Sequence, residues 1–244
     1  MNNYGSNIKF TLRNYAKILF AYCGIYFSKQ PAKYDQLIEE IKKSLLINSS
    51  YVFHIGAHYG QEASYYDELN LEVLWVEAST VPFKILKKNL KEFKNQKALK
   101  ALLGDKNGLK VVFHNASNDA SSSIFKFGTD HNDKNLTMIS SQEIEMVRMD
   151  KLFKYKTLKR FSYWCIDVQG AELLVLKGAG KLIRIPDVIE IEVSTREEYA
   201  GAPLFEDLDL FLRDHGFIPI WAPRINSHEN IIYIRLNKPK IRYT

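Results

Sequence analysis

Residues 51–77 read YVFHIGAHYGQEASYYDELNLEVLWVE and predict a strand, a tight turn, a helix and a second strand. The run 51–55 is apolar and contains β-branched and aromatic side chains, which is typical of a buried parallel strand. Gly56 ends this run and Gly60 follows in the turn, so the backbone there can adopt positive φ and come close to a ligand. The free N–H groups of the predicted helix 61–70 would face the same place. The stretch therefore predicts a ligand-binding turn between a strand and a helix.

The predicted second strand, residues 72–76, is followed by Glu77, about twenty residues after the first glycine. A carboxylate at this position can accept two hydrogen bonds from a ribose diol, as in dinucleotide-binding units. Only Gly56 and Gly60 are present, however, where the dinucleotide fingerprint has three glycines. The turn has less need to wrap a pyrophosphate, so the pattern favours an adenosine ligand without a diphosphate over NAD.

Two motifs resemble those of a known family. The segment 54–60, HIGAHYG, together with Glu77 resembles motifs I and II of class I S-adenosylmethionine-dependent methyltransferases, although many such enzymes carry an acid where this chain has His54. The segment 165–178, CIDVQGAELLVLKG, is similar to the signature of the FkbM methyltransferase family. The resemblance covers residues 51–234 and implies an enzyme that uses S-adenosyl-L-methionine. It also implies methyl transfer to an oxygen of a small molecule or glycan, first of all a sugar hydroxyl in a surface polysaccharide or natural product.

The rest of the chain alternates between predicted strands and helices. Further strands are predicted at residues 98–103, 109–114, 144–149, 161–166 and 188–193, with a closing antiparallel pair at 217–221 and 231–235. Such alternation predicts an α/β, Rossmann-like fold with a mostly parallel seven-stranded sheet and helices on both faces. We expect this domain at residues 48–244, after an N-terminal helical extension at residues 1–47.

Ligands of such sheets bind beyond the carboxyl ends of the strands. With the resemblance, this rule predicts the following site residues. The predicted cofactor-binding residues are Gly56, Ala57, Gly60, Gln61, Glu77, Ala78, Gly104, Asp105, Ser121 and Ser122. The predicted substrate-binding residues are Asn118 and Gln169, and the predicted catalytic residues are Asp167 and Glu172. Glu77 would hold the ribose, Gly104 and Asp105 would flank the adenine with Leu103, and the polar loop 115–129 is either a segment that folds over the cofactor or a plain surface loop.

Asp167 follows the predicted strand 161–166 and opens the second motif, so it is expected to face the acceptor. A hydroxyl acceptor has to lose its proton to a base. An aspartate with an ordinary pKa near 4 is a weak base, and burial or a metal ion would have to assist it. A catalytic Mg²⁺ held by Asp167 and neighbouring acids is therefore left open. The alternative is that Asp167 only orients the substrate or caps the next helix. His54 and His58 lie across a strand end and a turn, so no resident metal ligands are predicted.

The composition of the chain indicates a globular protein. The chain is 46% hydrophobic and 25% charged, as is ordinary for a globular protein, and its net charge is +6. Much of the excess positive charge is lysine within residues 84–94, where the apolar spacing predicts an amphipathic helix with a solvated lysine face. Such a face argues against a nucleic-acid partner. The chain has only two cysteines, too few for a disulfide framework, which favours a reducing cytoplasm.

The apolar segment 8–27 carries Lys9, Arg13 and Lys17 and is too interrupted by charge for a membrane span. It is predicted either to lie on an anionic membrane, at its inner face, or to pack on this protein or on a second copy in a homodimer. Two functional alternatives also remain open. One is a catalytically inactive Rossmann-fold adaptor, which a shielded Asp167 without a pocket would favour. The other is a nucleic-acid methyltransferase.

Overall fold

The computed structural model describes residues 34–131 and 135–236. Its centre is a seven-stranded sheet with the strand order β3-β2-β1-β7-β8-β10-β9. These strands are β1 (Tyr51–Ile55), β2 (Glu72–Glu77), β3 (Gln96–Lys100), β7 (Tyr163–Ile166), β8 (Val188–Ser194), β9 (Phe217–Pro219) and β10 (His228–Arg235). The first five in the spatial order are parallel, whereas β10 runs antiparallel to β8 and β9. The predicted fold class is confirmed, including the closing antiparallel pair.

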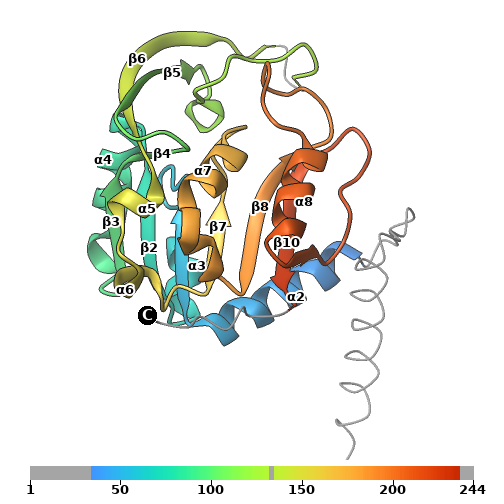
Figure 1. Ribbon diagram of the computed structural model, residues 1–244. Helices are drawn as coiled ribbons and strands as arrows, with labels where there is room; N and C mark the ends of the chain where they lie inside the picture. The colour runs from blue at the N-terminus through green and yellow to red at the C-terminus, as the bar shows by residue number, and fades with distance from the viewer. Residues whose placement is uncertain (1–33, 132–134, 237–244) are drawn as a thin grey trace, which may run out of the picture.

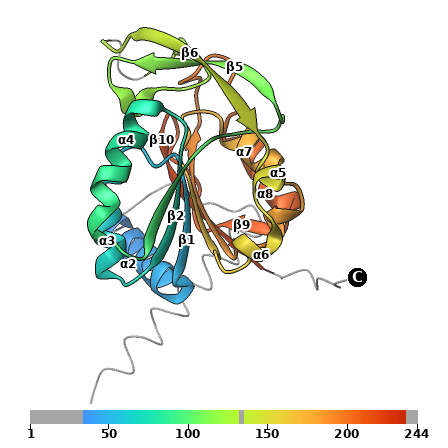
Figure 2. The same cartoon turned by 90° about the vertical axis from the view of Figure 1, so that its left-hand side faces the viewer.

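Helices cover both faces of this sheet (Figures 1 and 2). One face carries α2 (Tyr34–Ser49), α3 (Ala63–Glu68) and α4 (Thr80–Asn89), with the 3₁₀ turn η1 (Leu90–Glu92). The other carries α5 (Met149–Leu152), α6 (Tyr155–Leu158), α7 (Glu172–Ala179), the 3₁₀ turn η3 (Gly180–Arg184) and α8 (Phe205–Asp214). Coverage on both sides explains why the central strands are continuous apolar runs. Phe53 on β1, for example, is fully buried and meets the rings of Phe153 and Trp164 edge-on at 5.4 and 5.6 Å.

Helix α2 packs directly on the sheet. Its Leu46 is fully buried, and Lys42 Nζ lies 2.6 Å from Glu190 Oε1 on β8. The second oxygen of Glu190 accepts a 2.7 Å hydrogen bond from Tyr163 Oη on β7. Lys42 and Leu46 of the predicted extension thus contact the core, while segment 8–27 lies outside the described residues. Within the part of the chain that the structure describes, no helix has the length and apolar character needed to cross a bilayer.

A second, three-stranded sheet lies above the carboxyl ends of the central strands (Figure 1). It has the order β4-β6-β5, with β4 (Leu102–Leu103), β5 (Leu109–Ala116) and β6 (Met138–Val147). The predicted strand 98–103 is therefore wrong as one element. Ala101 N still bonds to Glu77 O of the main sheet at 3.0 Å, but Leu102 and Leu103 pair with β6. The predicted strand 144–149 also ends early, because helix α5 begins at Met149.

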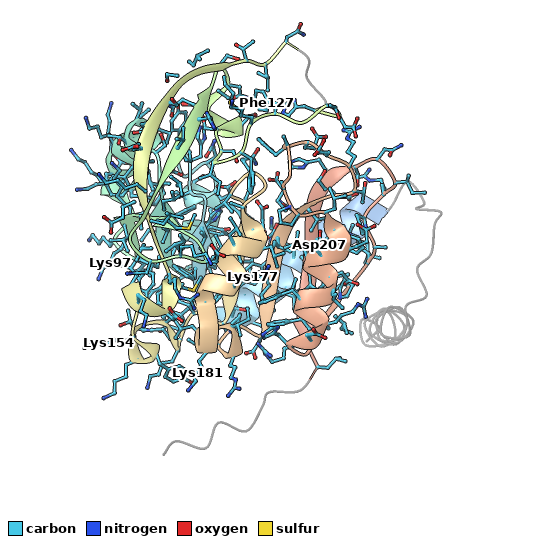
Figure 3. The ribbon with its side chains drawn as sticks, turned by 45° about the horizontal axis from the view of Figure 1, so that its top comes forward. Lys97, Phe127, Lys154, Lys177, Lys181 and Asp207 are labelled. Carbon is cyan, nitrogen blue, oxygen red and sulfur yellow. The ribbon has the colours of Figure 1, made fainter. Side chains whose placement is uncertain are left out.

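The lysine-rich helix α4 is amphipathic, as predicted. Lys84, Lys87 and Lys88 are exposed, whereas Leu86 packs in the core. On the opposite face of the sheet, the side chains of Lys154, Lys177 and Lys181 extend outward into solvent (Figure 3). The exposed positive charge is therefore distributed over both faces of the molecule.

Candidate active site

A cavity of about 320 Å³ lies at the carboxyl ends of β1, β2 and β7, below the second sheet. This volume falls in the range of small-molecule sites. The predicted site residues that line it are Gly56, Ala57, Gln61, Glu77, Ala78, Ser122, Asp167 and Gln169. The predicted site residues outside its lining are Gly60, Gly104, Asp105, Asn118, Ser121 and Glu172. The carboxyl ends of the strands thus converge on one cavity, as the alternating pattern predicts.

The two glycines of the first turn are required by the packing of the protein itself. Gly56 has φ +89°, and a Cβ atom there would lie 1.6 Å from the carbonyl oxygen of Asp167. Gly60 has φ +73°, and a Cβ atom there would lie 2.7 Å from Leu86 Cδ1. The N–H groups of Gly56 and Ala57 both donate to the carbonyl oxygen of Val76, at 2.9 and 3.1 Å. Gly56 therefore lets β1 and β7 approach each other beside the cavity, and Gly60 lets the turn pack closely against Leu86 of α4.

Gly104 and Asp105 lie away from the cavity because the chain leaves the main sheet before reaching them. A Cβ atom on Gly104 would lie 2.4 Å from Met146 Sδ of β6, and the Asp105 carbonyl accepts from Arg148 Nη1 at 3.0 Å. Leu102 and Leu103 line the cavity instead, together with Phe113. Part of the apolar lining therefore comes from the second sheet, a sheet that the sequence did not reveal.

Glu77 is buried at the end of β2, and backbone donors hold its carboxylate in place. Oε2 accepts from His58 N at 2.8 Å, and Oε1 accepts from Ser79 N at 2.6 Å. Burial raises the pKa of Glu77, while the hydrogen bonds from Ser79 and His58 counteract this rise. A carboxylate accepts about four hydrogen bonds, so the backbone donors leave part of its acceptor capacity for a ligand. This arrangement fits a group that receives the hydroxyls of a ribose.

Asp119 links the polar loop to the turn after β1. It begins the 3₁₀ turn η2 (Asp119–Ser121) and lines the cavity. His58 Nε2 lies 2.9 Å from Asp119 Oδ1, and the Tyr59 hydroxyl donates to Oδ2. Gln61 Nε2 lies 2.7 Å from His58 Nδ1, so the network assigns the imidazole proton to Nε2. Sequence reasoning missed Asp119, since no local spacing relates it to His58, 61 residues earlier.

Asp167 follows β7 and forms the opposite wall of the cavity with Gln169. The Gln169 amide nitrogen donates to Asp167 Oδ1 and to Glu192 Oε2, both at 2.7 Å. The Tyr199 hydroxyl donates to Gln169 Oε1 at 2.7 Å, which fixes the orientation of the amide. Gln169 has φ +56°, and Ser123 Oγ holds its carbonyl oxygen at 2.6 Å. The polar loop thus also contacts this wall, through Ser123.

The electrostatics of this wall depend on two residues that the sequence did not single out, Glu192 and His228. Burial raises the pKa of Asp167 well above its ordinary value, and the neighbouring Glu192 carboxylate raises it further. His228 Nε2 lies 2.8 Å from Glu192 Oε1. Burial alone would lower the pKa of His228, but hydrogen bonding to Glu192 raises it to about 9. The wall therefore contains a carboxyl pair flanked by an imidazolium.

Glu172 is buried below the wall and braces the turn after β7. Its Oε1 accepts from Val168 N at 2.8 Å and from Gly170 N at 3.2 Å. Burial raises the pKa of Glu172 to about 7, although these hydrogen bonds oppose the rise. The side chain holds the backbone that carries Asp167 and Gln169. Its predicted catalytic role stays a prediction, and Glu172 itself lies outside the cavity lining.

Among the described residues, oxygens of Asp167, Glu172 and Glu192 come within 4.8 Å of one another. The Gln169 amide nitrogen, however, donates to two of these carboxylates, and two backbone N–H groups occupy the third. The carboxylate oxygens that would bind a cation therefore accept hydrogen bonds from N–H groups, and in this arrangement the residues do not fit Mg²⁺.

His54 lies at the base of the cavity as a neutral side chain. Burial and, to a smaller extent, the charge on Lys42 lower its pKa to about 3. Its Nδ1 lies 3.2 Å from the Tyr66 hydroxyl, and its ring stacks on Trp75 with centroids 4.5 Å apart. A histidine held in this way packs as part of the core and offers no charge to a ligand.

Comparison with known proteins identifies a family. Residues 54–219 match the family model described as the methyltransferase FkbM domain, and no curated protein matches the chain significantly. One similar solved structure is a SAM-dependent methyltransferase from Aquifex aeolicus, with 13% identity, a TM-score of 0.43, and coverage of 80% of this chain and 87% of that one. Another is magnesium protoporphyrin IX methyltransferase from Synechocystis PCC 6803 with bound SAM. It has 10% identity, a TM-score of 0.46, and coverage of 92% and 91%.

Proposed function

Because the chain belongs to the FkbM methyltransferase family, we propose that it transfers the methyl group of S-adenosylmethionine to a hydroxyl oxygen of a small molecule or glycan. The observation that best supports this proposal is the single cavity that contains the Glu77 carboxylate, the 56–61 turn and Asp167. Glu77 would bind the ribose hydroxyls, and Asp167 would face the acceptor. The same cavity lacks the three-glycine turn expected for a dinucleotide.

Different cavity residues would contact the ribose, the adenine and the methionine end of the cofactor. Glu77 would accept hydrogen bonds from the ribose hydroxyls, each worth about 1.5–3 kcal/mol. Ala78, Leu102 and Leu103 would contact the adenine, because they form the apolar lining beside Glu77. The backbone at Gly56 and Ala57 would meet the methionine end. The bound cofactor supplies a methyl carbon made electrophilic by its sulfonium.

Asp167 is proposed as the base. As the acceptor oxygen forms its bond to the methyl carbon, the carbon–sulfur bond breaks, its electron pair stays on sulfur, and the hydroxyl proton passes to Asp167. A raised pKa makes this carboxylate a stronger proton acceptor once it is ionised. Aligning the two reactants can contribute about 7–11 kcal/mol, so the rigid wall around Gln169 matters as much as the base itself.

The charge of the wall supports a neutral acceptor. Asp167 lines the cavity, and Glu172 and Glu192 lie directly behind it. Even with the His228 imidazolium behind Glu192, a phosphate or carboxylate acceptor would bring further negative charge next to the Asp167 carboxylate that has to ionise as the base. A sugar hydroxyl of a surface polysaccharide or natural product fits better. Other parts of the proposal rest on the sequence. They are a role in polysaccharide biosynthesis, a cytoplasmic location at the inner face of a membrane, membrane contact through residues 8–27, and a homodimer.

The adaptor alternative has lost its main support, since Asp167 borders a cavity. A direct test is to supply S-adenosylmethionine with a ¹³C-labelled methyl group to a panel of neutral oligosaccharides, uronic acids, amines and RNA. NMR would then locate the label. We expect an O-methyl signal on a neutral sugar, lost in Asp167→Asn while S-adenosylhomocysteine still binds. Label on nitrogen, on a carboxylate or on RNA would contradict the proposal.

A further inference from the structure

The methionine part of S-adenosylmethionine carries an ammonium group, which needs an anionic or carbonyl partner when it enters a cavity. His54, at the base of this cavity, is neutral and bonded to Tyr66. It therefore supplies no negative charge. Another residue has to meet the ammonium group if the cofactor binds as proposed.

Four carboxyl groups line the cavity, those of Glu62, Glu77, Asp119 and Asp167. Burial raises the pKa of Glu77 and of Asp167, and partial desolvation raises the pKa of Glu62, an exposed residue at the start of α3. Glu77 also has its proposed ribose role, and Asp167 already accepts from Gln169. Glu77 and Asp167 thus already have other roles, and desolvation disfavours the charged form of Glu62.

Asp119 differs from the other three in both position and partners. His58 and Tyr59, which hold its two oxygens, belong to the turn that begins at Gly56. The carboxylate is therefore fixed beside the segment assigned to the methionine end. Although partial burial raises the pKa of Asp119, the hydrogen bonds from Tyr59 and His58 bring it below the ordinary value. An ionised carboxylate with free lone pairs thus borders the cavity at this point.

We propose that Asp119 is the counter-ion for the ammonium group of S-adenosylmethionine, and that His58 and Tyr59 hold it in place for this role. This inference rests on the proposed cofactor. It assigns the polar loop 115–129 a specific task, since η2 would contribute a charged contact to the cofactor. It also provides a physical reason why a histidine is tolerated at position 54.

The test is isothermal titration calorimetry with two adenosyl thioethers. S-adenosylhomocysteine contains the amino-acid group, whereas 5′-methylthioadenosine has the same nucleoside and sulfur without it. In Asp119→Asn we expect S-adenosylhomocysteine to bind about tenfold more weakly, which is the lower end for a charge-assisted hydrogen bond because 38% of the Asp119 side chain is exposed. The affinity for 5′-methylthioadenosine should stay unchanged, which also shows that the variant is folded.

Matched controls separate the ammonium contact from a general effect on the loop. Asp130→Asn removes an exposed carboxylate just after the same loop and outside the cavity lining, and it should leave both affinities unchanged. An equal loss for both ligands in Asp119→Asn, or no loss for either, would overturn the inference while leaving the proposed function intact. Failure of the wild-type protein to bind either ligand would refute the proposed cofactor and this inference together.

Discussion

At the scale of single residues, the carboxyl groups near the cavity differ in pKa because their surroundings differ. Burial dominates for Glu172 and for Asp167, whereas hydrogen bonds from two side chains determine the direction of the shift at Asp119. An acid whose pKa is raised on folding binds more protons in the folded state than in the unfolded state. Such a group makes the folded protein less stable as pH rises.

Glu172 permits a test of this effect. Its pKa rises from an ordinary value of 4.5 to about 7 on folding. Its contribution to stability is therefore fully present below about pH 4.5 and is lost as pH rises through 7, a change of about 3 kcal/mol. In Glu172→Gln, the difference in free energy of unfolding between pH 5 and pH 8 should shrink by up to that amount, measured by urea denaturation at both values. The exposed Glu206→Gln is the control, and an unchanged difference in Glu172→Gln would contradict the assigned environment.

Sequence reasoning identifies which acids follow strands, because strand ends can be read from the apolar runs. Glu77 and Asp167 were found in this way, and both line the cavity. The environment of each acid could not be read, since Glu192 and His228 approach Asp167 from β8 and β10, strands distant in the chain. The contact between His58 and Asp119 could not be predicted either, because these residues are also far apart in the chain.

At the scale of elements, the central sheet was predictable and the second sheet was not. Buried parallel strands are mostly apolar, so β1, β2, β7 and β8 stand out from their neighbours, although β8 also carries Glu190 and Glu192. The run 98–103 is equally apolar, but it crosses from one sheet to the other at Ala101. Composition does not show where such a run changes its pairing partner, because the pairing depends on residues some forty positions away in β6.

Helix α2 is predicted to contribute to stability through one buried ion pair. Removing the charge of Lys42 would leave Glu190 buried beside Tyr163 without its cation. We expect Lys42→Met to lower the free energy of unfolding by about 3 kcal/mol or more, since the apolar stem is retained and a buried charge is left unpaired. The exposed neighbour Lys43 offers the matched variant Lys43→Met, which should cost little. Equal losses in the two variants, measured by urea denaturation, would show that α2 is not held by this pair.

At the scale of the whole molecule, the two sheets have separate tasks. The main sheet brings Glu77 and Asp167 to one edge, and the second sheet covers this edge with apolar side chains (Figure 1). The loop 115–129 joins both, through Asp119 to the first turn and through Ser123 to the wall around Asp167. Cofactor and acceptor would therefore meet in a cavity whose walls come from distant parts of the chain.

The most direct test of this account is calorimetric titration of the full chain with S-adenosylmethionine, S-adenosylhomocysteine and NAD, repeated on Glu77→Ala. The account predicts micromolar binding of both adenosyl ligands, no binding of NAD, and a loss of about tenfold or more in affinity for the adenosyl ligands in the variant. Binding of NAD in their place, or adenosyl binding that is unaffected by Glu77→Ala, would contradict the assignment of this cavity as the cofactor site.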